Sequence, residues 1–225
     1  MTPTAGDVIM NETFADEDWS SLDLADARFD DCRLLRCKFA HADLREATFK
    51  ICGFADADGQ QGANFAFARL DEASFENCNL AHARFEGADL YAARFKDCRL
   101  LGARFTRARF FRAFGRSVVR ASVTFNDCNL DLADLAGLNL AACDLSDSRF
   151  QAADLSGADL EGANLTGSNL FHAILDGAKL AGADLRRAEI SGLDLRRLGT
   201  SRDMKITAGQ QFALLDAMGI DVCVD

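Results

Sequence analysis

The chain has 225 residues, a formal net charge of -10 and 49% apolar residues, which is enough apolar material for a continuous core. No apolar stretch reaches the ~20 residues of a membrane-spanning helix, and the first ten residues lack the basic start and apolar segment of a secretory signal. We therefore expect a cytoplasmic protein that makes no contact with a membrane.

A large apolar residue recurs at every fifth position along the chain. These centres run from Phe14 to Phe54, from Phe65 to Phe110 and from Phe125 to Leu195. A small residue, most often Ala, stands two positions before each centre, and seven of the eight cysteines occupy this same slot. A period of five fits neither a helix nor a strand, so it predicts a coil that turns one corner per pentad and closes a square after four.

The pattern predicts an all-β fold, a right-handed quadrilateral β-helix over residues 12–198, with an N-terminal lead at 1–11 and a tail at 199–225. The centres and small residues face inward, and successive coils stack at the ~4.8 Å spacing of paired strands. The cysteines are then free core thiols that act as small hydrophobes. Centres twenty residues apart should form interior columns, and this spacing puts Phe65, Phe85, Phe105 and Phe125 in one column opposite Phe75 and Phe95.

Two segments interrupt the repeat. Residues 55–62 lie within an eleven-residue step that adds one residue over two pentads and is rich in turn formers. Residues 111–124 place Gly115 and Arg120 in slots that need Leu or Phe, and a charged side chain would not be buried there. Both segments are predicted to leave the coil as loops, which commonly carry binding functions.

The tail beyond the last centre has a different pattern. The segment TAGQQFALLDAMG predicts a short helix, with Thr207 and Gln210 as a capping box and Gly219 at its end. The alternation in IDVCV predicts a small strand. An apolar helix at the open end of a coil serves either as a cap or as a contact with a second copy, and the pattern favours neither.

Charge is distributed unevenly along the chain. Residues 125–185 carry ten acids and two bases, whereas residues 104–120 carry six arginines and no acid. Carboxylates repeated at the coil spacing could present a potential resembling that of a nucleic-acid duplex. Alternatively, Asp is common before each centre because it bonds to neighbouring backbone there. The acidic half argues against direct nucleic-acid binding.

The sequence shows no catalytic or metal-binding constellation. His41, His82 and His172 all fall in outward slots far apart along the coil, and the glycines of ADGQQG follow no strand-to-helix pattern. We therefore expect a binding protein without cofactor or metal, and not an enzyme.

The run ADLSGADLEGANLTGSNL resembles the pentapeptide-repeat family, and the resemblance extends over about residues 12–198. The segments DGQQGANFAFARLDEASFENCNL and MKITAGQQFALLDAMGIDV resemble the Qnr-type quinolone-resistance proteins. In that family two loops interrupt the coil and a C-terminal helix joins two rods into a homodimer. The dimer binds the type II topoisomerases DNA gyrase and topoisomerase IV as a DNA mimic and protects them from quinolones.

The resemblance also implies roles for individual residues. It assigns partner-binding loop contacts to Asp56, Asp58, Gln60, Gln61, Arg112, Phe114, Arg116, Val118, Val119 and Arg120. It assigns the acidic DNA-mimic surface to Asp127, Asp134, Asp144, Asp147, Asp154, Asp159 and Asp184, and the dimer interface to Phe212, Leu215, Met218 and Ile220. The second loop departs from relatives in being strongly basic. An immunity factor against a natural gyrase poison and a structural scaffold with an unrelated partner remain as alternative functions.

Overall fold

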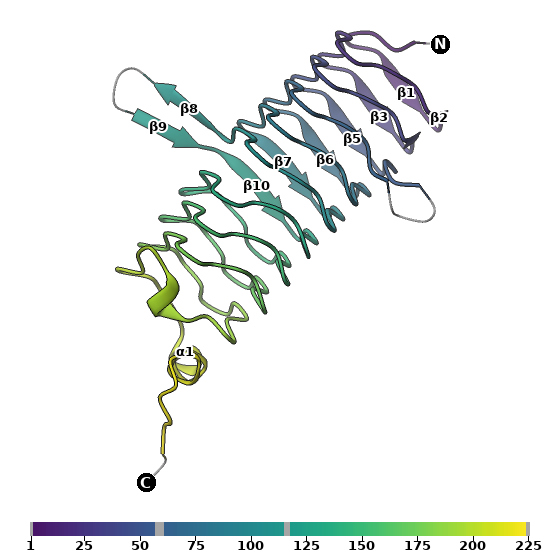
Figure 1. Cartoon of the computed structure of the whole chain (residues 1–225). Helices are drawn as coiled ribbons and strands as arrows, with labels where there is room; N and C mark the ends of the chain where they lie inside the picture. The colour runs from purple at the N-terminus through teal and green to yellow at the C-terminus, as the bar shows by residue number, and fades with distance from the viewer. Residues whose placement is uncertain (1, 57–60, 115–117, 224–225) are drawn as a thin grey trace.

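The five-residue repeat closes into a coil because each pentad contains a corner residue with left-handed backbone. A computed structural model describes residues 2–56, 61–114 and 118–223. Two positions after a centre, φ is positive, for example +59° at Asp26 and +60° at His41. Glycine occupies the same position at Gly157, with φ of +64° and no steric cost. Four such corners complete one coil, and the coils stack into a four-sided rod (Figure 1).

Parallel backbone pairing joins successive coils on all four sides. One side forms a six-stranded sheet in the order β1-β3-β5-β6-β7-β10, a second side carries the pair β2-β4, and isolated bridges continue the ladders toward the C-terminus. The strands are β1 (Val8–Met10), β2 (Thr13–Ala15), β3 (Arg28–Asp30), β4 (Arg33–Leu35), β5 (Thr48–Lys50), β6 (Ser74–Glu76), β7 (Ala93–Lys96), β8 (Phe111–Phe114), β9 (Val118–Ala121) and β10 (Val123–Asn126). The predicted all-β solenoid with a short C-terminal helix is confirmed.

We name the four faces of the rod by the outward residue just before each centre. Face A carries Asp18, Lys38, Asn64, Arg84, Arg104, Asp134, Asp154 and Ile174. Face B carries Asp23, Asp43, Arg69, Asp89 and Arg109, then Asn139, Asp159, Lys179 and Thr200. Face C carries Val8, Arg28, Thr48, Ser74, Arg94, Thr124, Asp144, Asn164, Asp184 and Lys205. Face D carries Thr13, Arg33, Gly53, Asn79, Arg99, Asn129, Arg149, Asn169 and Glu189.

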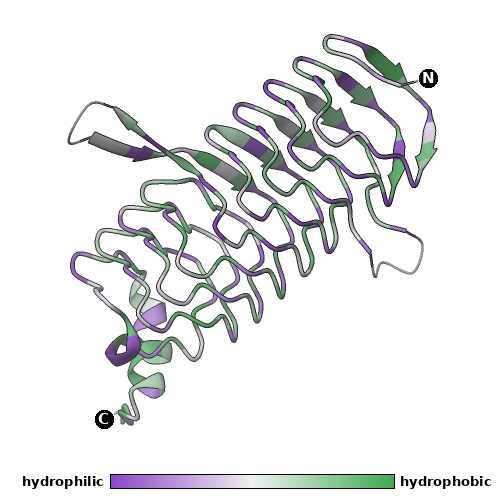
Figure 2. Cartoon of the chain, turned by 45° about the horizontal axis from the view of Figure 1, so that its top comes forward, coloured by the Kyte–Doolittle hydropathy of each residue, from purple (hydrophilic) through white to green (hydrophobic). Residues whose placement is uncertain are grey.

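The apolar centres fill the interior as stacked columns. Phe85 is fully buried and its ring stacks between Phe65 and Phe105, with ring centroids 5.0 and 4.9 Å away. Rings of the opposite column approach edge-on, as Phe75 does toward Phe65 at 6.0 Å. The hydropathy of the chain accordingly alternates within each coil (Figure 2). Stacked and edge-to-face arrangements are the favourable ones for aromatic pairs.

The predicted column of Phe65, Phe85, Phe105 and Phe125 is wrong in its last member. Phe125 stacks on Phe95 at 4.8 Å and pairs with it in the ladder, so it belongs to the column of Phe75. The reason is that each loop leaves and returns at the same corner. Phe110 and Phe125 are therefore consecutive centres, and the fifteen-residue step contains ten inserted residues. The step from Phe54 to Phe65 likewise contains six inserted residues, and not one.

The coil extends further at both ends than the bounds predicted from the sequence. Strand β1 at Val8–Met10 already pairs with β3, and Lys205 still pairs with Asp184. The helical elements are η1 (Leu195–Arg197), which lies within the last coil, and η2 (Ala208–Gln210) and α1 (Gln211–Ala217), which follow it. The Thr207–Gln210 capping box is present, and Leu214 of α1 is buried against the last coils. Residues 220–223 form no strand, because no neighbouring strand pairs with them.

The seven cysteines of the small slot are buried free thiols, as expected. Five of them stack in one column at Cys32, Cys52, Cys78, Cys98 and Cys128, and the column continues with Ser148 and Ser168. The thiols of this column donate to backbone carbonyls, as Cys98 Sγ does to Phe75 O at 3.4 Å. Burial raises the pKa of the Cys37 and Cys143 thiols, which lie outside this column, to about 11. These groups are therefore thiols at neutral pH and serve packing.

Replacing Phe85 with Ala is expected to lower the free energy of unfolding by about 3–5 kcal/mol, because it removes a ring held between two others and leaves a cavity. Urea unfolding would measure the change. Leu132→Ala is the matched control, since that side chain is 62% exposed and its loss should cost less than about 1 kcal/mol. Equal stabilities of the two variants would contradict the assignment of inward-facing centres.

Candidate functional site

The first loop leaves the rod at the corner between faces D and A. The N–H of Asp56 donates to the carbonyl of Gln61 at 3.4 Å, which closes the base of the loop. Gly62 then lies directly against the next coil, where a Cβ atom would come within 2.4 Å of Ala81 O. Asp58 and Gln60 fall outside the described residues. The loop is thus tied to the rod on its returning side by a position that only glycine fits.

The second loop is an antiparallel hairpin of β8 and β9 at the corner between faces B and C. It projects away from the rod (Figure 1). The N–H of Ser122 donates to Phe110 O at 2.8 Å, so the two ends of the insertion meet at the corner. Val123 and Thr124, predicted as loop, belong instead to β10 of the coil. Phe114, Val118 and Val119 lie in the hairpin strands, Arg120 is exposed, and Arg116 falls outside the described residues.

Arg112 on β8 faces the body of the rod. Its Nη2 atom lies 3.0 Å from Asp71 Oδ2 and 3.9 Å from Asp89 Oδ2, and its guanidinium carbon lies 4.9 Å from the centre of the Tyr91 ring. The resemblance assigned Arg112 a partner contact, whereas here its charge is already engaged within the chain.

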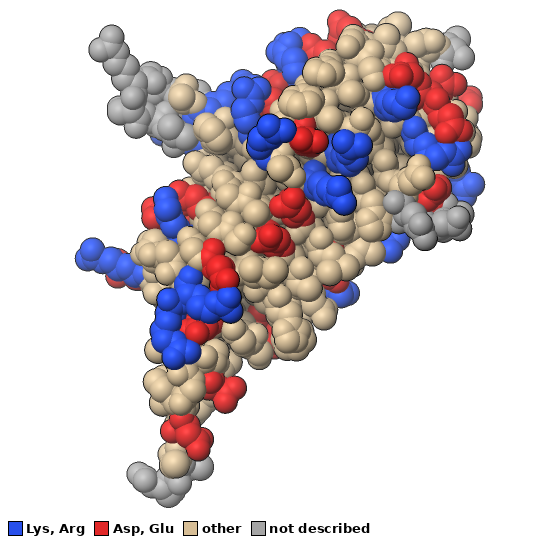
Figure 3. All heavy atoms as spheres, in the orientation of Figure 1, with Lys and Arg blue, Asp and Glu red and all other residues tan. Residues whose placement is uncertain are grey.

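The arginines of the basic segment that lie on the coil are divided between faces A and B. Arg109 on face B pairs with Asp89 at 3.1 Å, and Arg107 at the corner of faces A and B pairs with Glu86 at 2.8 Å. Arg104 on face A makes no ion pair among the described residues. Basic side chains gather beside the base of the hairpin (Figure 3). The net positive potential of this region is thus lower than the sequence suggests.

The seven predicted acids lie on three faces and not on one. Asp144 and Asp184 stand on face C with Asp127 and Asp147 at its corner, Asp134 and Asp154 stand on face A, and Asp159 stands on face B. Asp159 and Asp184 are ion-paired, with Lys179 at 3.4 Å and Arg186 at 2.6 Å. The remaining five make no ion pair among the described residues. They form two acidic ridges on opposite faces, which we call the face A ridge (Asp134, Asp154) and the face C ridge (Asp127, Asp144, Asp147).

Many of these acids also hold the turns of the coil. Asp134 Oδ1 accepts a hydrogen bond from Ala136 N at 3.2 Å, and Asp154 Oδ1 accepts one from Ser156 N at 2.9 Å. Asn139 and Asn169 make the same bond in equivalent pentads. The alternative expected from the sequence, that Asp serves the local backbone, is therefore confirmed for this slot. Because Asn does so equally, the negative charge itself is not needed for the turn.

Asp144 shows how the face C ridge keeps its charge. Burial raises the pKa of this carboxyl, but hydrogen bonds from Asn126, Ser146 and Asn164 outweigh the burial and lower the pKa below its usual range. Asn126 Nδ2 and Asn164 Nδ2 donate to it at 3.0 and 2.8 Å. Asp144 is thus anionic at neutral pH.

The C-terminal helix presents an apolar face to solvent. Phe212 and Ile220 are 52% and 47% exposed, Leu215 and Met218 are half-buried, and Leu214 packs on the coil. Gly219, with φ of +74°, ends the helix. The helix therefore covers the end of the coil with one side and leaves Phe212 and Ile220 available on the other.

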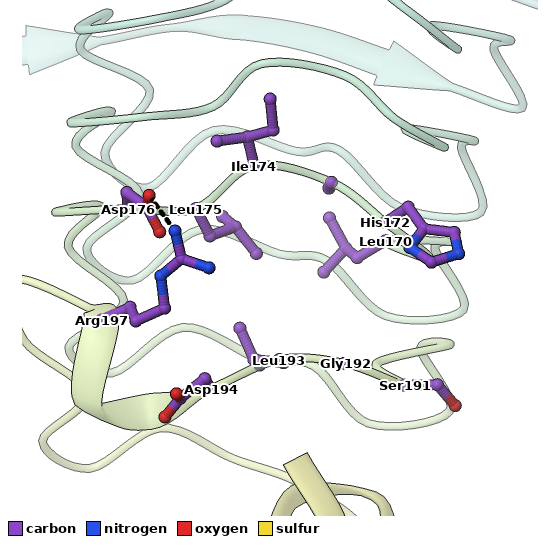
Figure 4. A pocket seen from close by; sticks show the side chains of 11 residues that line it. Leu170, His172, Ile174, Leu175, Asp176, Ser191, Gly192, Leu193, Asp194 and Arg197 are labelled. Atoms are coloured by element: carbon purple, nitrogen blue, oxygen red, sulfur yellow. Dashed lines mark hydrogen bonds and ion pairs between the residues drawn. The ribbon is translucent and has the colours of Figure 1, made fainter. Parts of the chain in front are cut away.

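A hollow of about 360 Å³ lies beside the last coils (Figure 4). Asp176 and Arg197 point toward one another there and form an ion pair. No hydrogen bond joins Ser191 to His172 in this hollow, so the two do not form a nucleophile and base pair. Across residues 2–56, 61–114 and 118–223, no group of three His, Cys, Asp or Glu is placed to hold a metal ion. Within the same ranges no helix has the length and apolarity to cross a membrane.

Sequence reasoning missed Asp71, Asp89 and Tyr91 as partners of the hairpin. Asp71 follows a centre of face B two coils before the hairpin, Tyr91 follows the centre one coil before it, and Asp89 precedes that same centre. Among the described residues Asp71 is one of four buried polar or charged residues, but burial is a property of the folded chain. A signal did exist in the spacing, because the centres Leu70, Leu90 and Phe110 are twenty residues apart and so share face B. The direction in which β8 leaves the corner, which brings Arg112 to these residues, has no such signal.

Comparison with known proteins gives matches at the level of family and of structure. The model described as "Pentapeptide repeats" matches residues 20–50, 61–97, 88–114, 128–167 and 163–197 in eight copies. A quinolone resistance pentapeptide repeat protein of Scandinavium goeteborgense, QnrB96, is 29% identical over 100 residues, or 44% of this chain. The matched segment is 47% of QnrB96, so this chain spans about half the length of that relative.

Solved structures match over nearly the whole chain. Full-length QnrB1, described as a plasmid-mediated fluoroquinolone resistance protein, is 27% identical, with a TM-score of 0.88 over 95% of this chain and 100% of that one. A trypsin-treated variant of QnrB1 is 26% identical, with a TM-score of 0.81 over 97% and 99% of the two chains. The similarity therefore extends over nearly the whole length of both chains.

Acid titration should reveal the Asp184–Arg186 pair. Hydrogen bonds from Arg186 lower the pKa of Asp184 to about 2, below the ordinary value of about 3.9. A carboxyl with a depressed folded-state pKa stabilises the fold above its ordinary pKa and loses that contribution as pH falls to the depressed value. The difference in melting temperature between the parent and Asp184→Asn should be full above pH ~5 and vanish near pH ~2. Arg186→Gln should follow the same pH course, and a difference that persists at pH ~2 would contradict the pairing.

Proposed function

This chain belongs to the pentapeptide-repeat family, and we propose that it binds the type II topoisomerases DNA gyrase and topoisomerase IV and protects them from quinolones. The observation that carries the proposal is the end-to-end structural match with full-length QnrB1, whose description is that of a fluoroquinolone resistance protein. A match of the coil alone would support only the fold, since one fold serves many functions. Because these topoisomerases act on chromosomal DNA, the proposal also places the protein in the cytoplasm.

The geometry supports recognition through surfaces. The rod is filled by stacked side chains, and the features that depart from its repeat are two insertions and a terminal helix. The insertions project from a rigid scaffold at different corners, as binding segments commonly do. We propose that both contact the topoisomerase.

The two acidic ridges support a duplex-like surface. A duplex presents two lines of charge along a common axis, with one charge per ~1.7 Å when both strands are counted. The face A and face C ridges also run along a common axis on opposite sides of one rod, at the coarser spacing of the coils. We propose that a DNA-binding surface of the topoisomerase accepts one of the ridges.

The exposed face of α1 supports a homodimer. Phe212 and Ile220 are apolar side chains left uncovered at the end of the rod. Pairing two copies through this end would bury them and double the length of the acidic rod.

The first test is a gyrase supercoiling assay with ciprofloxacin across a titration of the protein. We expect restored supercoiling at protein concentrations near that of gyrase, because the protein competes for the drug-sensitive complex. Two deletions are matched probes. Removing residues 56–61 or 112–121 restores the five-residue spacing of centres, so each should abolish protection while the circular dichroism of the rod is kept. The melting temperature should stay unchanged on removal of 56–61, whereas removal of 112–121 also takes Arg112 away from Asp71 and should lower it.

Failure of protection by the parent protein, with no inhibition at high concentration either, would contradict topoisomerase binding. Rescue from a natural gyrase poison but not from ciprofloxacin would indicate the immunity function instead. Deletions that unfold the rod would contradict the assignment of these segments as insertions.

Removing charge from one ridge at a time should identify the DNA-mimic face. Asp134→Asn with Asp154→Asn removes the charges of the face A ridge and keeps the turn hydrogen bonds, which Asn also accepts. Asp127→Asn with Asp147→Asn removes two of the three charges of the face C ridge and keeps Asp144, because both of its carboxylate oxygens accept hydrogen bonds from neighbouring coils. We expect one pair to raise the protein concentration needed for protection by about tenfold or more, with little change in melting. Protection equal to that of the parent in both double variants would contradict DNA mimicry.

Charged substitutions on α1 and just after it should separate the dimer. Phe212→Glu with Ile220→Glu is expected to halve the solution mass measured by light scattering, because it places two charges in an apolar contact. Asp216→Asn, on the same helix, is the control and should leave the mass unchanged. A parent protein that is already monomeric would contradict the proposed dimer.

A further inference from the structure

The β8–β9 hairpin needs support from the rod to keep one direction. It is a two-stranded ribbon of four residues on each side, and isolated ribbons of this size are marginally stable. The hydrogen bond from Ser122 N to Phe110 O holds its two ends together at the corner of the coil, but a single corner does not determine the angle at which the ribbon leaves.

Arg112 supplies a second point of attachment. It is the second residue of β8, and its guanidinium contacts Asp71, Asp89 and Tyr91 on two successive coils of face B. The contact therefore reaches from the projecting ribbon back to the rod. The hairpin strands pair with each other and not with the coils, so the backbone joins the hairpin to the rod only at the corner. Arg112 therefore adds a second connection between the hairpin and the rod.

The chemistry of Asp71 makes this bridge specific. Asp71 is only 9% exposed, and its Oδ1 atom is buried without a hydrogen-bond partner, so Arg112 is the cation that compensates its charge. The Arg112 side chain is 41% exposed, so only the Asp71 side of the pair is buried. Removing Arg112 would leave that buried carboxylate uncompensated, which costs more than losing a fully exposed pair. The Tyr91 ring adds a cation–π contact to the same guanidinium.

The register of the hairpin adds a further reason for the Arg112 side chain to point toward face B. Arg112 lies directly opposite Arg120 across the two strands, where like charges repel. The ion pairs of Arg112 with Asp71 and Asp89 neutralise one of these two positive charges. Arg120 is exposed and forms no ion pair with any residue that the structure describes.

We propose that Arg112 is a positioning residue, a clasp that holds the β8–β9 hairpin against Asp71, Asp89 and Tyr91 and so sets the direction in which the hairpin projects. The residue acts within the chain and does not contact the partner. Its consequence for binding rests on the proposed function, because a hairpin held in its bound orientation loses less freedom when the topoisomerase docks.

The direction of the hairpin can be measured without any partner. In a Cys223→Ser background the other seven cysteines are buried, so spin labels attach only to introduced sites. Ala113→Cys places one label on β8 and Glu161→Cys places the other on an exposed position of the rod. We expect a narrow distribution of distances by double electron–electron resonance, and Arg112→Gln should at least double its width. A width unchanged by Arg112→Gln would overturn the clasp.

Arg109→Gln is the matched control for this experiment. Arg109 also pairs with Asp89, at 3.1 Å, but it lies on the coil and not on the hairpin. Its replacement should leave the distribution narrow. Asp71→Asn removes the clasp from the side of the rod with the hairpin sequence intact, so it should broaden the distribution as Arg112→Gln does. Broadening by Arg109→Gln but not by Asp71→Asn would contradict the proposal.

The supercoiling assay then tests the consequence. We expect Arg112→Gln to raise the protein concentration for half protection about tenfold, which corresponds to about 1.4 kcal/mol of lost preorganisation. Arg112→Lys keeps the charge, so its concentration for half protection should lie between those of the parent and of Arg112→Gln. Full protection by a variant with a broadened hairpin would overturn the role in binding. If the parent gives no protection, the proposed function fails, and the distance measurement still decides the clasp.

Discussion

The backbone ladder between coils is the constraint on which the rest of the molecule depends. Each coil donates to and accepts from its neighbours on four sides, and this requires every coil to have the same circumference. A residue with positive φ, such as Asp26 or Gly157, turns each corner, and a buried centre occupies each side. Because the circumference cannot vary, any additional residue must leave the coil completely and return at the corner where it left.

That constraint explains where functional variation can occur. The interior is limited to residues that fit a fixed square, and even the cysteine column serves packing through bonds such as that from Cys98 to Phe75 O. The outward slot before each centre tolerates Asp, Asn, Arg or Lys, so charge can be patterned along the rod without disturbing it. Insertions at corners are the second route, and the clasp of Arg112 on Asp71 shows that an insertion can be oriented by the outward residues of earlier coils.

A protein built in this way is suited to present an extended surface. The acidic ridges on faces A and C run along a rigid axis, the hairpin projects from one corner, and the first loop lies at the diagonally opposite corner. The end of the rod is closed by Leu214, while Phe212 and Ile220 remain uncovered beside it. These features fit a partner that recognises a long, straight, negatively charged object from several sides, as the proposed topoisomerase complex requires.

The sequence by itself determined the fold, the inward centres, the presence of two extracoil segments and the capped C-terminal helix. These follow from local rules, because a five-residue period admits only one regular coil and an arginine in a core slot must leave it. Only the tertiary structure decided the interior column of Phe125, the faces that carry each acid and the attachment of Arg112. The first two depend on how many residues each insertion adds, and a sequence period does not report that number once it is interrupted. The attachment of Arg112 depends on the direction in which the hairpin leaves its corner. A shift of one pentad moves every later side chain to another face, so the placement of charge on this rod is a property of the folded ladder.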